Sequence, residues 1–213
     1  MDNIFAIQYG YGRSREATAI AQYCVMHDSK YRVFKNISDV HKDMIPIGSV
    51  EFCEGILGKT IKPDNYPNFL KQYCHREVYE SDVIPPNKKL FIKPSDRYKR
   101  FTGFISDGAT NEDPPYWCSE IVNFVNEWRY YVSYGKVLTG EWYSGDEINV
   151  PDAPELDVTF PEDYCGAVDF GVLDNGKIAL VEAHHPFACG WYGKDYKIYA
   201  DWITKGWEYI LNQ

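Results

Sequence analysis

One stretch near the C-terminus, residues 168–184, constrains the fold of this chain more than any other. It consists of two apolar runs separated by Asp174-Asn175-Gly176. An Asn-Gly pair between apolar runs is among the strongest signals for a β-hairpin, because both central residues of the turn must accept a positive φ. Each run carries one carboxylate, Asp169 in the first and Glu182 in the second. The hairpin predicts that these two acids lie side by side.

Two neighbouring carboxylates in strands that are otherwise apolar need a partner. A buried carboxylate is costly unless it is paired, protonated or bound to a cation. The two acids also repel each other, and a divalent cation relieves that repulsion. Mg²⁺ binds through one or two carboxylates together with substrate phosphates, so the hairpin suggests a magnesium–nucleotide site. The alternative, a surface hairpin with two solvated acids, stays open at this point.

The composition indicates a folded globular protein with an acidic surface. The 213 residues are 45% hydrophobic and 16% aromatic, enough for one substantial core or two small lobes. The 22 basic and 31 acidic residues give a net charge of −9, which argues against broad binding to nucleic acid. A basic concentration at residues 88–100 still allows a narrow local groove.

The cysteines and the apolar runs indicate a cytoplasmic location. No Cys-x-x-Cys pair is present, so the pattern fits neither a common zinc site nor a disulfide framework and predicts reduced thiols. We see no signal peptide and no apolar run of membrane-spanning length, so we expect no membrane association.

The order of predicted elements suggests two regions. The first strand covers residues 3–8, and Ser14 is placed to cap the helix that follows. Pro85-Pro86-Asn87 breaks the chain and divides it into an α/β lobe (1–85) and a second region (86–213). In the second region we expect strands at 89–93, 101–105, 117–125, 129–132 and 137–142, then the hairpin, and a terminal amphipathic helix at 201–211.

Lys93 is the first of three further features that suggest the same ligand. It ends an apolar strand, Phe91-Ile92-Lys93-Pro94, where a partly buried ammonium needs an anion such as a phosphate. A lysine that reaches back to solvent from a strand edge is the ordinary alternative. The turn at residues 95–103 could cover phosphates with backbone N–H groups and with Lys99 or Arg100.

The other two features lie between residues 120 and 132. Glu120, Ile121 and Val122 form an extended apolar segment of the kind that reads adenine through backbone groups between two lobes, although a plain core strand has the same appearance. Glu127 and Arg129 are two residues apart and project from one face of a strand. They form a surface pair, or Arg129 stabilises charge on a transferring phosphoryl group or an acyl-phosphate.

The order of these segments resembles that of the ATP-grasp superfamily. Four segments carry the resemblance: 91–94, 126–129, 168–172 and 180–184. Within the superfamily the chain is most similar to a small clade of ligase-like proteins from bacteria and phages. In that clade Val-Glu-x-Asn is followed by Gly-x-Tyr, which is matched here by residues 181–184 and by Gly190-Trp191-Tyr192.

The resemblance implies an α+β fold in which a small N-terminal α/β lobe precedes two lobes, each an antiparallel sheet with helices, that grip ATP between them. It implies that Lys93 contacts the α- and β-phosphates and that Arg129 faces the γ-phosphate or acyl-phosphate. The adenine hinge would be residues 120–122, with Lys99, Arg100 and Glu127 as further nucleotide contacts. The implied metal ligands are Asp169, Glu182 and His184.

Two departures from the family pattern concern the same site. His184 stands where the family usually carries asparagine, and Mg²⁺ prefers oxygen ligands. His184 therefore supports the ligands from behind, or the site prefers a metal such as Mn²⁺, or the chemistry is altered. The phosphate-covering turn is short and poor in glycine. The first ATP-binding lysine of larger members has two candidates here, Lys71 and Arg76.

The implied reaction is ATP- and Mg²⁺-dependent ligation of a carboxylate to an amine through an acyl-phosphate. Catalysis of this kind depends mostly on positioning and charge neutralisation. The donor and acceptor, small molecules or a protein or peptide terminus, are not readable from the sequence. Two alternatives are a phosphotransferase and a degenerate nucleotide-binding protein that acts through a partner.

Overall fold

The computed structural model describes residues 4–96 and 100–213. Within these ranges the chain forms three sheets, three α-helices and two 3-10 helices. The elements are β1 (Ile4–Gln8), α1 (Arg15–Met26), β2 (Lys30–Phe34), η1 (Ile37–Asp39), β3 (Ile45–Ile47), α2 (Val50–Leu57), η2 (Asn68–Tyr73), β4 (Val78–Ser81), β5 (Leu90–Pro94), β6 (Phe104–Ser106), β7 (Tyr116–Ser119), β8 (Phe124–Ser133), β9 (Lys136–Ser144), β10 (Gly166–Leu173), β11 (Ile178–His184) and α3 (Tyr196–Leu211).

The N-terminal part is a small parallel sheet with two capped helices. Its strand order is β2-β1-β3, and both pairs are parallel. Ser14 accepts a hydrogen bond from the backbone N–H of Ala17 at the start of α1, as the sequence predicts, and Ser49 does the same for Phe52 at the start of α2. Each cap satisfies an N–H group that has no partner inside its helix.

The large sheet is antiparallel and supports the C-terminal helix. Its strand order is β11-β10-β8-β9. Helix α3 packs beside it, and the indole N–H of Trp202 donates to the carbonyls of Val132 and Gly166, at 3.1 and 3.2 Å. The helix begins at Tyr196 rather than at the predicted residue 201, because the side chain of Asp195 caps the backbone N–H groups of Lys197 and Ile198.

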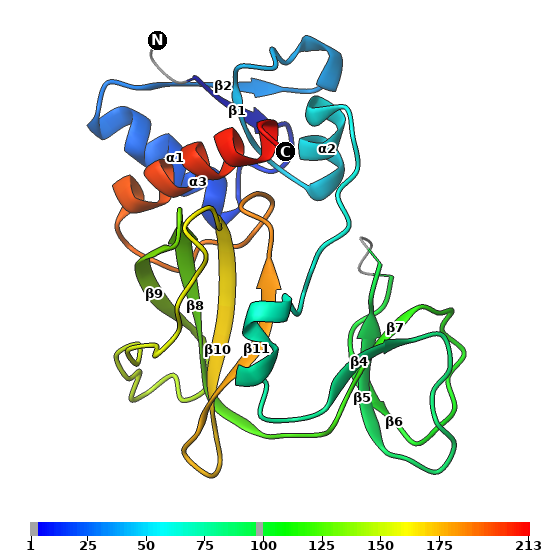
Figure 1. Cartoon of the computed structure of the whole chain (residues 1–213). Helices are drawn as coiled ribbons and strands as arrows, with labels where there is room; N and C mark the ends of the chain where they lie inside the picture. The colour runs from blue at the N-terminus through cyan, green and yellow to red at the C-terminus, as the bar shows by residue number, and fades with distance from the viewer. Residues whose placement is uncertain (1–3, 97–99) are drawn as a thin grey trace.

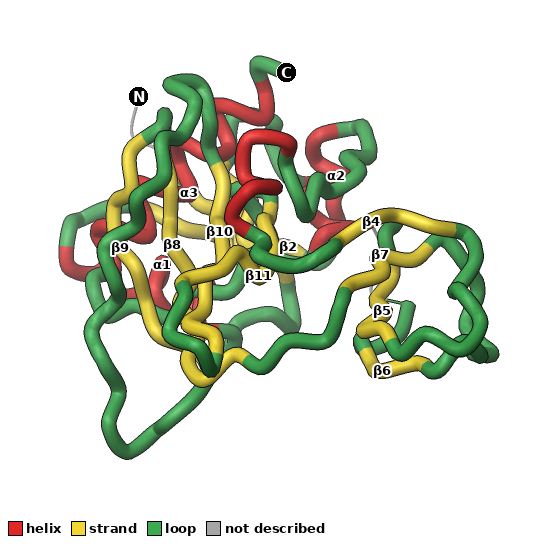
Figure 2. Tube along the Cα trace, turned by 60° about the horizontal axis from the view of Figure 1, so that its bottom comes forward, coloured by secondary structure: helices red, strands yellow, loops and turns green. Residues whose placement is uncertain are grey.

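The small sheet stands apart from the other two and is joined to them through residues 74–77 and 120–123 (Figures 1 and 2). Its order is β4-β7-β5-β6, with antiparallel pairing throughout. The helix that the resemblance implies for this lobe is absent from the described part of residues 78–119, where the connections carry prolines instead. The division of the chain at residue 85 stays a prediction, and β4, which precedes it, pairs with β7, which follows it.

The α+β prediction is confirmed. A first core cluster joins α1, α2 and α3 to the parallel sheet, a second fills the large sheet beneath η2, and a third lies in the small sheet. All six cysteines are buried and none forms a disulfide among the described residues. Among these residues we find no helix with the length and apolar character needed to span a bilayer.

Candidate nucleotide and metal site

The predicted hairpin is confirmed, and it places the two carboxylates opposite each other. In β10 and β11 the register pairs Asp169 with Glu182, and Gly176 takes the positive φ of the turn at +82°. Asp169 is 1% exposed, which excludes the interpretation of a solvated acid at this position. The side chain of Glu182 is 28% exposed and faces the space between the sheets.

Arg129 is the partner of Asp169. The two residues are register partners on β8 and β10, and two guanidinium N–H groups of Arg129 donate to the two carboxylate oxygens at 2.8 and 2.7 Å. Burial acts to raise the pKa of Asp169, but His184 and Arg129 outweigh it and hold the pKa below its usual range. Arg129 therefore pairs across the sheet, and not with Glu127 on its own strand.

His184 completes a group of three possible metal ligands. Its Nε2 lies 2.9 Å from Arg129 Nη2, 3.1 Å from Asp169 Oδ2 and 3.4 Å from Glu182 Oε1. Asp169, Glu182 and His184 each offer a ligand atom, and these atoms lie within 4.8 Å of one another. Two carboxylates and an imidazole fit a divalent cation that also binds phosphates. Glu182 and His184 are the accessible donors, because Arg129 engages both oxygens of Asp169.

Lys93 brings the small sheet into this group. Its ammonium, on β5, forms a hydrogen-bonded ion pair with Glu182 on β11 and lies 4.8 Å from the centre of the Tyr66 ring. Burial lowers the pKa of Lys93, but Glu182 and Tyr66 more than compensate, so the pKa is raised. The same pair, with His184, holds the pKa of Glu182 below its usual value against the effect of burial.

A first cavity, of about 330 Å³, lies where the two four-stranded sheets meet. Residues 120–122 line one side of it, outside any regular element, as predicted for a hinge rather than for the continuous strand 117–125. Two hydrogen bonds fix this segment: the Glu120 backbone N–H donates to the carbonyl of Glu77, and the Glu120 carboxylate accepts from the backbone N–H of Glu77. Phe91, Lys93 and Glu182 also line the cavity.

Glu127 reaches the same cavity from β8. Its carboxylate accepts a hydrogen bond of 2.7 Å from the Tyr143 hydroxyl. Burial and the nearby charge of Asp169 raise the pKa of Glu127. Glu127 thus offers a hydrogen-bonding carboxylate at the wall of the cavity, beside the hinge.

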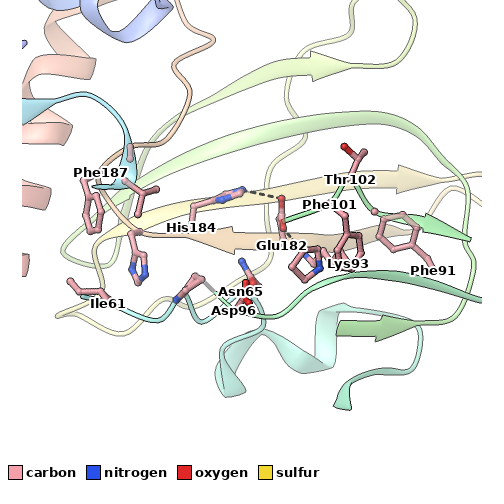
Figure 3. Close-up of a pocket in the computed structure, with 16 residues that line it drawn as sticks. Ile61, Asn65, Phe91, Lys93, Asp96, Phe101, Thr102, Glu182, His184 and Phe187 are labelled. Carbon is pink, nitrogen blue, oxygen red and sulfur yellow. Dashed lines mark hydrogen bonds and ion pairs between the residues drawn. The ribbon is translucent and has the colours of Figure 1, made fainter. Parts of the chain in front are cut away.

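A second cavity, of about 420 Å³, begins at the same lysine and glutamate. Figure 3 shows Glu182 and His184 near its middle, Ile61 and Phe187 toward one end, and Phe91 and Phe101 toward the other. Because Phe91, Lys93 and Glu182 line both cavities, the two spaces meet at the Lys93–Glu182 ion pair.

The remaining predicted nucleotide contacts lie elsewhere. Arg100 bonds Asp96 at 2.6 Å and the Asp113 carbonyl at 2.7 Å, and it lines neither cavity, so its contact with phosphate stays a prediction. Lys99 falls outside the described residues. Arg129 also lines neither cavity and reaches the second one through His184.

Three residues join the sheets beside the site, and none had been assigned a firm role from the sequence. Arg76 donates to Ser119 Oγ at 2.9 Å and to the carbonyls of Leu180 and Val181 on β11 at 2.6 and 3.3 Å. Asn65 links the Trp117 indole to the carbonyl of Ala183, and Tyr66 covers Lys93. Their partners are distant in sequence, so only the weighing of Arg76 as a nucleotide ligand hinted at this region.

The fold and this site define an ATP-grasp protein. Residues 73–202 match the model of an ATP-grasp domain family, the second family of its clade within the superfamily, and the chain belongs to that family. The predicted superfamily is confirmed, and so is the class of enzyme, an ATP-dependent ligase of the ATP-grasp type. A comparison with curated proteins gives no significant match.

Solved structures share the fold at very low sequence identity. The ATP-grasp ligase PsnB with a minimal precursor has 9% identity over 96% of this chain and 100% of that chain, with a TM-score of 0.52. D-alanyl-alanine synthetase A from Vibrio cholerae has 9% identity over 100% of both chains and a TM-score of 0.51. N5-carboxyaminoimidazole synthetase from Staphylococcus aureus has 9% identity over 95% of this chain and 77% of that chain, with a TM-score of 0.56.

Proposed function

We propose that this protein uses Mg·ATP to ligate a carboxylate to an amine through an acyl-phosphate. The observation that carries the proposal is the meeting of two cavities at Lys93 and Glu182. A nucleotide in the first cavity would present its phosphates at this ion pair. A second substrate in the other cavity would meet the γ-phosphate at the same place.

The nucleotide would lie along the first cavity with its base at the hinge. Backbone groups of residues 120–122 would bind adenine, and the carboxylate of Glu127 would accept hydrogen bonds from the ribose. Lys93 would leave Glu182 and contact the α- and β-phosphates. This exchange keeps the lysine charge neutralised, because a phosphate replaces a carboxylate as its partner.

Glu182 and His184 would hold the metal, with Asp169 beside them. Bound Mg²⁺ would neutralise phosphate charge. Mn²⁺ is the alternative that an imidazole ligand favours over the all-oxygen preference of Mg²⁺. Asp169 would keep Arg129 oriented toward the reacting phosphoryl group through their two hydrogen bonds.

The reaction has two balanced steps. A carboxylate oxygen attacks the γ-phosphorus, the bond from this phosphorus to the bridging oxygen breaks, and ADP leaves. The amine nitrogen then attacks the acyl carbon, the C–N bond forms, phosphate leaves, and the amine gives up a proton. Arg129 would stabilise the charge that builds on the phosphoryl oxygens, since a guanidinium presents two parallel donors.

Isothermal calorimetry of ATP with Mg²⁺, and then with Mn²⁺, tests the nucleotide site. We expect metal-dependent binding to the wild type and weaker binding to Lys93→Ala and Glu182→Gln. Release of ADP and phosphate only when an amine is present would support the ligase. A phosphorylated product would indicate a phosphotransferase, and retained binding without turnover over a broad acceptor panel would indicate a degenerate protein. A folded wild type that binds ATP with neither metal would refute the site.

A further inference from the structure

The walls of the second cavity are mostly apolar. The apolar lining comes from four separate segments: the start of α2, the segment that follows α2, the segment after β5, and the segment after β11. They supply Val50, Ile61, Pro63, Phe101 and Phe187. A cavity of about 420 Å³ with such walls fits a ligand with a hydrophobic body of one or two amino-acid residues.

The charges of this cavity do not suit an anionic ligand. Among the described residues that line it, Lys93 is the one cation and Asp96 and Glu182 are the two carboxylates. The ammonium of Lys93 already pairs with Glu182. A phosphate or carboxylate group needs guanidinium or ammonium donors, and an ammonium group finds carboxylates instead.

The cations near the site gather around Tyr192, outside the described lining of the second cavity. The guanidinium of Arg129 lies 5.3 Å from the centre of the Tyr192 ring, and that of Arg15 lies 4.9 Å from it. Under the proposed reaction, a carboxylate donor is better matched to this cationic group. The apolar cavity is then left for the amine.

One polar atom at the cavity has no partner among the described residues. His185 lines the cavity, and its ring stacks on Phe187 at 5.3 Å with an interplanar angle of 2°. Its Nε2 is buried and makes no hydrogen bond. Such an atom is a candidate partner for a polar group on an otherwise apolar ligand.

We infer that the second cavity binds the amine substrate, and that this substrate is a peptide N-terminus with a hydrophobic first residue. The hydrophobic side chain would lie against Ile61 and Phe187, and the amino group would lie toward Glu182. A free amino acid fits less well, because its α-carboxylate would lack a cation in this part of the cavity. The inference rests on the proposed function.

Calorimetry on the complex with Mg·AMP-PNP tests the inference with four probes: leucinamide, the tripeptide Leu-Gly-Gly, leucine and O-phosphoserine. We expect leucinamide and the tripeptide to bind at least about tenfold more tightly than the two probes that carry an anion next to the amine. Leucinamide represents the shared chemistry, and the tripeptide and leucine distinguish a peptide terminus from a free amino acid.

An added cation should reverse the preference. Ile61→Arg is expected to weaken leucinamide by at least about tenfold and to strengthen O-phosphoserine, without changing the affinity for Mg·AMP-PNP. Val33→Arg is the matched control, because Val33 is 55% exposed on β2, lines neither cavity and should alter no affinity. If Ile61→Arg does not fold, Thr102→Arg places the same charge on an exposed lining residue.

The outcomes separate the inference from the proposed function. If Mg·AMP-PNP binds but leucine or O-phosphoserine binds as tightly as leucinamide, the substrate class is wrong and the nucleotide site stands. Tight leucine binding equal to that of the tripeptide would likewise overturn the assignment to a peptide terminus. If the folded protein does not bind Mg·AMP-PNP, the proposed function fails and the inference fails with it.

Discussion

Lys93 of β5 and Glu182 of β11 form an ion pair that crosses from the small sheet to the large sheet. Both side chains line both cavities, so the pair lies at the point where the two spaces meet. In the proposed function these two residues separate, because one binds phosphate and the other binds metal. The nucleotide-free protein therefore neutralises its metal carboxylate with its own phosphate-binding lysine.

Metal and nucleotide should consequently bind as a unit. We expect AMP-PNP to raise the affinity for Mn²⁺ by at least about tenfold, because phosphates release Glu182 from Lys93. Electron paramagnetic resonance of Mn²⁺ checks this in titrations with and without nucleotide, corrected for Mn²⁺ bound to free AMP-PNP. In Lys93→Met, Glu182 has lost its partner, and Mn²⁺ alone should bind more tightly than to the wild type. Equal Mn²⁺ affinity in all these cases would contradict the exchange.

Asp169 should be essential for stability as well as for the site. In Asp169→Asn the buried guanidinium of Arg129 loses its neutralising partner, which typically costs about 3–5 kcal/mol of unfolding free energy. Urea unfolding followed by tryptophan fluorescence measures the loss. The exposed helical pair Lys197–Asp201 provides the control, and Asp201→Asn should leave the transition unchanged. Similar curves for Asp169→Asn and the wild type would show that Arg129 finds another partner.

The same carboxylate predicts an acid-sensitive contribution to stability. The pKa of Asp169 is lower in the folded protein than the unfolded value of about 4. Its contribution is therefore complete above that unfolded value and is lost as the pH falls through the folded pKa. We expect the difference in unfolding free energy between the wild type and Asp169→Asn to be constant from neutral pH to about pH 5 and to shrink below about pH 4. A difference that does not change down to pH 3 would rule out this linkage.

The sequence predicted what depends on neighbouring residues. The Asn-Gly turn sets the register of the hairpin, and that register alone places Asp169 opposite Glu182. The partner of Asp169 could not be predicted in the same way. Arg129 lies on a strand 40 residues earlier, so their pairing depends on how β8 aligns with β10, which no local pattern specifies.

The lobe arrangement shows the same limit. The segment 117–125 reads as one apolar strand, but it is divided between two sheets, with β7 ending at Ser119 and β8 beginning at Phe124. The interruption arises from tertiary contacts, because Glu120 bonds the backbone of Glu77. Local propensity does not contain that contact, although the family resemblance does imply a hinge at this place.

Arg76 and Lys71, the two candidates for the missing ATP-binding lysine, should behave differently. Arg76 lines the first cavity and its guanidinium joins β7 to β11, whereas Lys71 is exposed on η2 and lines neither cavity. In Arg76→Met the carbonyls of β11 lose a charged donor, so we expect a loss of about 1–3 kcal/mol in unfolding free energy. Affinity for AMP-PNP should fall at least about tenfold, measured by calorimetry.

Arg76→Lys separates bridging from simple charge. Lysine keeps the positive charge but cannot reproduce the guanidinium fork, so a bridging role predicts that this variant also binds AMP-PNP weakly. Lys71→Met is the matched control and should leave both stability and nucleotide affinity unchanged. Full AMP-PNP affinity in Arg76→Lys would mean that charge near the phosphates, and not the connection between the sheets, is what Arg76 contributes.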